Sequence, residues 1–177
     1  MVLSCASPCI QGISDPETAN AMAIEVNNEL ARQISNNTLR FGAFAALSMH
    51  NATVAAEELK RTVTELGFLG GLVNDYQQSG ADNGRSICNP RDSSISHVAY
   101  LEDTLIFFDQ PEFDVFWEMV TELDVPIYFH PRVNVEPIFT LLYGHAPWLK
   151  SASQEFAATL SSHVLGLCTN GVFEYVF

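Results

Sequence analysis

Apolar positions along the chain follow two alternating patterns, a helical period and short continuous runs. The helical period predicts a first helix beginning at Asp15-Pro16, where Asp15 can cap the helix and Pro16 suits its first turn. Asn51 can cap a second helix, and a third is expected to start after Asp109. Two more helices are predicted over residues 136–143 and 154–169.

The continuous apolar runs cover residues 41–47, 70–73 and 125–129 and predict strands that are buried on both faces. A long polar loop is expected from Tyr76 to about Glu102. Buried strands that alternate with amphipathic helices indicate parallel βαβ units with right-handed crossovers. The fold class is therefore α/β, and both a doubly wound sheet and a (β/α)₈ barrel fit the pattern.

Polar residues follow each predicted strand, and in either fold functional groups gather at these carboxyl ends. His130 follows the third strand and is a candidate metal ligand, with a simple hydrogen-bonding role at the rim as the alternative. Asn74 follows the second strand and could hold a substrate oxygen or merely turn the chain. No glycine-rich phosphate loop follows a strand, which weakens a dinucleotide-binding interpretation.

Other polar residues favour structural roles. We expect a local role for His50, a turn for Asp75 and a packed, hydrogen-bonded side chain for His163. Cys5 and Cys9 could in principle join Cys88 and His97 in a zinc site, but their spacing matches no standard pair.

Composition excludes several function classes. The 177 residues carry a formal net charge of −13, with eight Lys and Arg in total, which argues against binding nucleic acid or an anionic membrane surface. No apolar run is long enough to span a membrane, and no secretory signal is visible, so we expect a cytoplasmic protein. In that setting the cysteines are expected to be reduced thiols: Cys5, Cys9, Cys88 and Cys168.

Four segments carry a resemblance to a known family. Residues 40–50, 65–75, 122–132 and 162–166 resemble, in order, segments of the metal-dependent, non-oxidative aromatic-acid decarboxylases of the amidohydrolase superfamily. These include the 2,3-dihydroxybenzoate, salicylate and γ-resorcylate decarboxylases. The resemblance implies a (β/α)₈ barrel and the loss of CO₂ from a small, hydroxybenzoate-like aromatic acid, in aromatic degradation or secondary metabolism.

The same resemblance implies a divalent metal cofactor, zinc or manganese, that acts as a Lewis acid. The metal-binding histidine of the family corresponds to His130, and the asparagine near the substrate corresponds to Asn74. Arg132 matches less securely, because relatives vary at that place. The family's proton donor and its other metal ligands have no counterpart in this sequence, so the catalytic residues stay unknown.

The departures from the family predict a partial barrel. A (β/α)₈ barrel needs ~250 residues, so residues 1–177 are expected to form a single barrel domain that is incomplete at both ends. Residues at about 84–102 are expected to be an inserted loop, because their polar character differs from the flanking sequence.

Three interpretations of function stay open. The chain could be a carboxy-lyase, a truncated and catalytically inactive remnant, or a hydrolase of the same superfamily. The resemblance also implies a homo-oligomer, whereas the open sheet edges of a partial barrel favour aggregation.

Overall fold

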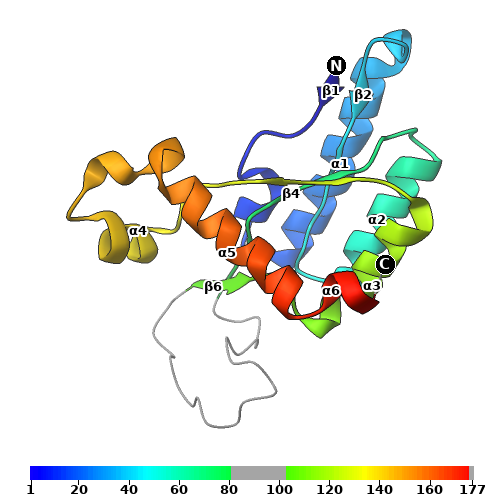
Figure 1. The fold of residues 1–177 in the computed structure, drawn as a ribbon. Coiled ribbons are helices and arrows are strands. Elements are labelled where there is room, and N and C mark those ends of the chain that lie inside the picture. The colour runs from blue at the N-terminus through cyan, green and yellow to red at the C-terminus, as the bar shows by residue number, and fades with distance from the viewer. Residues whose placement is uncertain (81–102, 176–177) are drawn as a thin grey trace.

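The computed structural model describes residues 1–80 and 103–175, which form parallel strands covered by helices (Figure 1). The strands are β1 (Val2–Leu3), β2 (Gly42–Ala43), β3 (Ala45–Ala46), β4 (Gly71–Asn74), β5 (Gln77–Gly80), β6 (Asp103–Ile106) and β7 (Ile127–His130). The helices are α1 (Pro16–Ile34), α2 (Ala52–Thr64), α3 (Asp114–Leu123), α4 (Glu136–Tyr143), α5 (Glu155–Thr169) and α6 (Val172–Tyr175). A 3₁₀ turn, η1 (Cys9–Gly12), precedes α1.

The strand pairing is that of consecutive βαβ units. β1 pairs with β2 in parallel, and β3, β4 and β7 form a parallel sheet in that order. β5 and β6 form a separate antiparallel ribbon. This mixed α/β arrangement is consistent with part of a (β/α)₈ barrel, as the sequence predicts.

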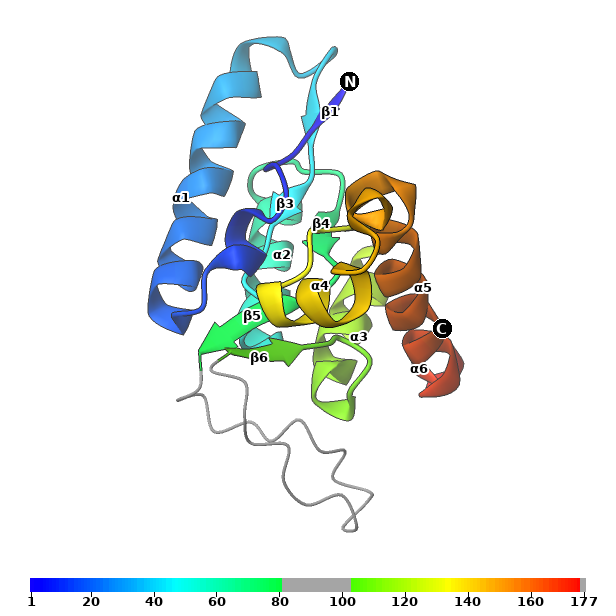
Figure 2. The same cartoon turned by 90° about the vertical axis from the view of Figure 1, so that its left-hand side faces the viewer.

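One face of the parallel sheet packs on α2 and α3. Ala45, Leu47 and Val73 alternate onto that face and contact a buried aromatic cluster that includes Phe116 and Trp117 of α3. A smaller cluster joins α1 to η1 and β3. Figure 2 shows α1 on one side of the strands and α5 on the other. Because successive residues of a strand point to opposite faces, the other face of the sheet stays available for a functional site.

The predicted caps start the first two helices. The Asp15 side chain accepts a hydrogen bond from the Thr18 N–H at 2.8 Å, and Asn51 accepts from the N–H groups of Thr53 and Val54. Gly67, three residues after the end of α2, has a φ of 72°, a conformation that costs glycine little. These local signals are confirmed.

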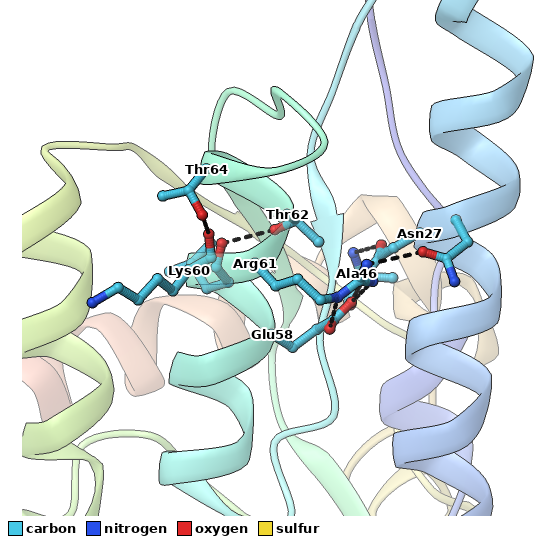
Figure 3. Close-up of polar contacts among 9 residues, drawn as sticks. Asn27, Ala46, Glu58, Lys60, Arg61, Thr62 and Thr64 are labelled. Carbon is cyan, nitrogen blue, oxygen red and sulfur yellow. Dashed lines mark hydrogen bonds and ion pairs between the residues drawn. The ribbon is translucent and has the colours of Figure 1, made fainter.

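A buried polar cluster connects α1, α2 and β3 (Figure 3). The Asn27 Oδ1 accepts from the Ala46 N–H at 2.8 Å, and its Nδ2 donates to the Ala46 carbonyl at 2.9 Å and to Glu58 Oε1 at 2.7 Å. Arg61 pairs with the same carboxylate at 2.8 Å. A helix side chain thus satisfies both backbone groups of a strand residue, and the Asn27 amide has no unpaired atom.

Two predictions about strands were wrong. The expected strand over residues 41–47 is divided at Phe44, since its N–H donates to Leu3 in β1 whereas the next N–H donates to Gly70 beside β4. The expected loop after Tyr76 begins instead with β5. Its residues are polar but buried, because Gln77 and Ser79 point into the protein, so hydrophobic patterning could not identify the strand.

The thiol prediction also needs correction. The structure joins Cys5 and Cys9 in a disulfide, whereas Cys168 is free and exposed. Cys88, His97 and the predicted inserted loop at 84–102 lie outside the described residues. Within the described part of the chain, no helix is both long and apolar enough to cross a membrane.

Candidate functional site

The two sequence-predicted site residues lie side by side. Asn74 ends β4, His130 ends β7, and the two are direct partners in the parallel register. Paired residues on neighbouring strands point to the same face, here the face opposite α2 and α3. The parallel sheet therefore brings together two residues that are 56 positions apart in the sequence, at the carboxyl edge where both were expected.

His130 is held in one tautomer. Its Nδ1 lies 2.6 Å from the Pro131 carbonyl oxygen, which can only accept, so Nδ1 carries the proton. The Nε2 lone pair is then available, and the ring is partly exposed. A hydrogen bond from one ring nitrogen to a backbone carbonyl is the usual support for a metal ligand that binds through the other nitrogen.

An aromatic surface adjoins His130 on the same face. Tyr128, two residues earlier in β7, packs edge-on against the imidazole with ring centroids 5.9 Å apart. Phe44 lies 6.4 Å from the Tyr128 ring. Tyr128 is 49% exposed, so its ring can still receive a flat apolar group.

Asn74 is fully buried and only half paired. Its Nδ2 donates to the Pro8 carbonyl at 3.1 Å and to Gln11 Oε1 at 2.8 Å, which uses both N–H groups. Its Oδ1 is buried and has no hydrogen-bond partner among the residues that the structure describes. A buried acceptor without a partner is costly and needs an explanation, and a bound ligand is one.

The segment of residues 7–13, which contains η1, crosses the ends of the strands. The Ser7 hydroxyl donates to the Pro131 carbonyl at 3.1 Å, and Gln77 Nε2 donates to the Ile13 carbonyl at 2.9 Å. The His50 Nε2 also lies 2.9 Å from that carbonyl, so the contact of His50 is structural, but with a residue 37 positions away rather than local. The segment therefore fixes the rim on which Asn74 and His130 sit.

Arg132 places a buried cation at the same rim. Its guanidinium donates to the carbonyls of Gln11 and Tyr76 and to the Gln78 side chain, and it stacks 4.4 Å from the Tyr76 ring centroid. Burial lowers the pKa of Arg132, with Tyr76 and Asp75 opposing that shift. No carboxylate in the described ranges lies within ion-pair distance of Arg132, and its hydrogen bonds go to neutral oxygens.

Asp75 and His163 form a buried pair on the opposite side of β4. His163 Nδ1 lies 3.4 Å from Asp75 Oδ1, and its Nε2 accepts the Phe108 N–H at 2.9 Å. His163 is packed and hydrogen-bonded through Nε2 as expected, but its buried Nδ1 has no hydrogen-bond partner among the described residues. Asp75 lies in the bend between β4 and β5 and is fully buried. Sequence reasoning missed this pair because its partners come from elements 88 residues apart.

The described residues bring together no group of three or more His, Cys, Asp or Glu side chains that could hold a metal. His130 can supply one ligand, while a zinc site normally needs three or four. Among the described residues, His130 would therefore supply one of the ligands that a metal site requires. Gln11 was also missed, since its contacts are with residues distant in the sequence and no local pattern marks it.

A family model described as amidohydrolase matches residues 7–165. A γ-resorcylate decarboxylase from Rhodococcus jostii (strain RHA1) is 37% identical over 174 residues, which is 98% of this chain and 47% of that protein. The chain thus spans about half the length of the curated relatives it matches.

Solved structures agree with this similarity. A dihydroxybenzoic acid decarboxylase from Polaromonas sp. JS666, with bound manganese and the inhibitor 2-nitroresorcinol, has a TM-score of 0.83 and 34% identity over 99% of this chain and 47% of that one. A 2,6-dihydroxybenzoate decarboxylase in complex with 2,6-dihydroxybenzoate has the same TM-score and identity, over 99% of this chain and 48% of its own.

Proposed function

Because the chain belongs to the amidohydrolase family, we propose that it forms the part of a metal-dependent aromatic-acid decarboxylase that carries one metal ligand and one substrate contact. His130 is the proposed ligand, through Nε2, and Asn74 the proposed substrate contact. The observation that carries this assignment is their pairing in register: an imidazole nitrogen of His130 and the buried Oδ1 of Asn74 have no hydrogen-bond partner among the described residues.

The proposed substrate is a small hydroxybenzoate-like acid. In the reaction the bond between the ring carbon and the carboxylate breaks, its electron pair stays with the ring and takes up a proton, and CO₂ leaves. The similar enzymes named above act on or bind resorcinol-type rings. On this chain, Tyr128 and Phe44 offer an aromatic surface beside His130, and Asn74 Oδ1 can accept a hydrogen bond from a ring hydroxyl.

The proposed cofactor is zinc or manganese, and manganese is present in the Polaromonas structure. When bound, such an ion supplies a Lewis acid for the carboxylate and the adjacent hydroxyl. His130 would hold the ion, and Pro131 would keep its ring in the required tautomer. The remaining ligands and the proton donor are assigned to no described residue.

The test compares metal binding by the wild-type chain and by His130→Ala, with His145→Ala as the matched control because His145 is exposed. Isothermal titration with Mn²⁺ and Zn²⁺ should give a site that His130→Ala weakens at least tenfold and that His145→Ala leaves unchanged. Equal affinity in all three proteins would contradict the assignment of His130. CO₂ release from 2,6-dihydroxybenzoate is then measured with the wild-type chain.

A non-catalytic remnant is the second candidate. The observation that favours it is the single metal ligand in the described part of the chain, since one histidine does not hold zinc tightly. Stoichiometric metal together with turnover would exclude the remnant, whereas metal-free protein without CO₂ release would support it.

Location and assembly complete the proposal. We propose a cytoplasmic protein that forms a homo-oligomer, in which the β7 edge would be covered, because an unpaired parallel edge invites pairing. Cell fractionation and size-exclusion chromatography with light scattering test these two statements. A monomer at micromolar concentration would contradict the second.

A further inference from the structure

We propose that Gln11 is a positioning residue that locks the Asn74 amide with its oxygen toward the ligand. The site would then accept a hydrogen-bond donor, such as a ring hydroxyl, or a cation, and would reject an acceptor. This inference rests on the proposed function, because it assigns an orientation to the proposed substrate contact.

The orientation of both amides follows from two backbone carbonyls. The Leu47 carbonyl can only accept, so the end of the Gln11 side chain beside it must be Nε2, and Oε1 points the other way. The Pro8 carbonyl likewise requires Nδ2 on the Asn74 side. The second Nδ2 proton then goes to Gln11 Oε1 at 2.8 Å. The relay thus leaves the Asn74 Oδ1 without a hydrogen-bond partner among the residues that the structure describes.

Burial makes the relay rigid. Asn74 is 0% exposed and Gln11 is 1% exposed, so no bulk water competes for their hydrogen bonds. A flipped Asn74 would set its oxygen against the Pro8 carbonyl and Gln11 Oε1, which would replace two hydrogen bonds with two repulsive contacts. The orientation is therefore fixed before any ligand arrives.

Gln11 is itself anchored. Its backbone carbonyl accepts from Arg132 Nη1 at 2.9 Å, and Arg132 lies two residues after His130 in the loop that follows β7. Gln11 thereby joins the ends of β3 and β4 through its side chain, and the loop after β7 through its backbone carbonyl. The free Oδ1 belongs to a residue in register with His130, so its acceptor lies on the face that carries the proposed metal ligand.

The first test needs no variant. In ¹⁵N-labelled wild-type chain, both Asn74 Nδ2 protons should be resolved and should exchange with D₂O at least tenfold more slowly than the amide protons of the exposed Asn28. Exchange as fast as that of Asn28 would overturn the lock. This readout does not depend on metal, substrate or turnover, so it can fail or succeed separately from the proposed function.

The second test is a double-mutant cycle with 2,6-dihydroxybenzoate and Mn²⁺ as the probes. Gln11→Met keeps the side-chain volume but removes both hydrogen bonds, and should weaken binding about tenfold in the wild-type background. In the Asn74→Ala background the same change should alter the Kd less than twofold, because Gln11 acts through Asn74. Gln33→Met, on the exposed face of α1, is the control and should leave the Kd unchanged.

An equal loss of affinity from Gln11→Met in both backgrounds would overturn the proposal, since it would mean that Gln11 acts on the fold rather than on Asn74. Thermal unfolding of each variant checks that the proteins compared are folded. If the wild-type chain fails to bind the probe at all, the proposed substrate is wrong, while the exchange measurement still decides the role of Gln11.

Discussion

Asn27 and Asn74 are the same residue type, both fully buried, yet they stand in opposite situations. Each Nδ2 donates two hydrogen bonds. The Asn27 oxygen accepts the Ala46 N–H, whereas the Asn74 oxygen has no partner among the described residues. All hydrogen-bonding groups of the Asn27 amide are therefore paired within the fold, whereas the Asn74 oxygen can still accept a hydrogen bond from a ligand. Burial and residue type therefore do not separate a structural asparagine from a functional one, but hydrogen-bond accounting does.

The largest effect is expected from breaking the complete amide. Asn27→Ala leaves the Ala46 N–H and carbonyl without their side-chain partner and removes a donor from Glu58, so it should cost about 3 kcal/mol of unfolding free energy. Urea unfolding followed by circular dichroism measures the loss. Asn28→Ala is the matched control, because the exposed Asn28 side chain bonds only to Arg61 among the described residues, so its loss should change stability by less than about 1 kcal/mol.

For Asn74, substitution should affect ligand binding as well as stability. Asn74→Ala leaves the Pro8 carbonyl and Gln11 Oε1 without this donor, but it also removes a buried acceptor that has no partner among the described residues. It should therefore cost less than Asn27→Ala, about 2 kcal/mol of unfolding free energy. The same variant should weaken 2,6-dihydroxybenzoate binding about tenfold, the equivalent of one lost hydrogen bond. If Asn74→Ala destabilised the chain as much as Asn27→Ala and left ligand affinity unchanged, the distinction between a structural Asn27 and a ligand-binding Asn74 would be wrong.

The smallest effect is expected on the outer face of α1, two residues from Asn27. Arg32 and Gln33 donate to the exposed Glu29 carboxylate and lower its pKa to about 2 from an ordinary value of 4.5. Because the folded pKa is the lower one, this contribution is present above about pH 4.5 and is lost as the pH falls toward 2. Exposure to solvent keeps it small.

A carboxyl-carbon NMR titration of Glu29 checks that shift. Arg32→Met should return the pKa of Glu29 toward its ordinary value while changing unfolding in urea little at neutral pH. A Glu29 with its ordinary pKa in the wild-type chain would show that the ion pair is absent in solution. Glu29 could then no longer serve as the exposed contrast to the buried Asn27 on the same helix.

Sequence reasoning found the features that local chemistry encodes. Helix caps at Asp15 and Asn51 and the apolar spacing of the helices depend on neighbours within a few residues, so they could be predicted. His130 and Asn74 were located by one further rule, that functional groups gather at the carboxyl ends of parallel strands. Their exact register was not predictable, because it depends on how β4 and β7 pair.

The missed features share a physical cause. Gln11, Asn27 and β5 use polar side chains whose partners are backbone groups from distant elements. Hydrophobic periodicity gives such residues no signal, and a polar residue appears exposed until its partner is known. The buried pair of Asp75 and His163 was missed for the same reason. A hydrogen-bond network exists only after the fold has brought its members together.

The segment of residues 7–13 has a consequence for how freely the chain can change. Several hydrogen bonds that hold this segment are accepted by its own main-chain carbonyls, those of Pro8, Ile10, Gln11 and Ile13. A main-chain acceptor is supplied by every amino acid. In a saturation library, positions 10 and 13 should therefore accept many apolar replacements of similar size, while the donors Asn74, Gln77 and Arg132 should tolerate few. The donor side chains that bind the segment would then preserve the shape of the rim, while the sequence of residues 7–13 itself would vary.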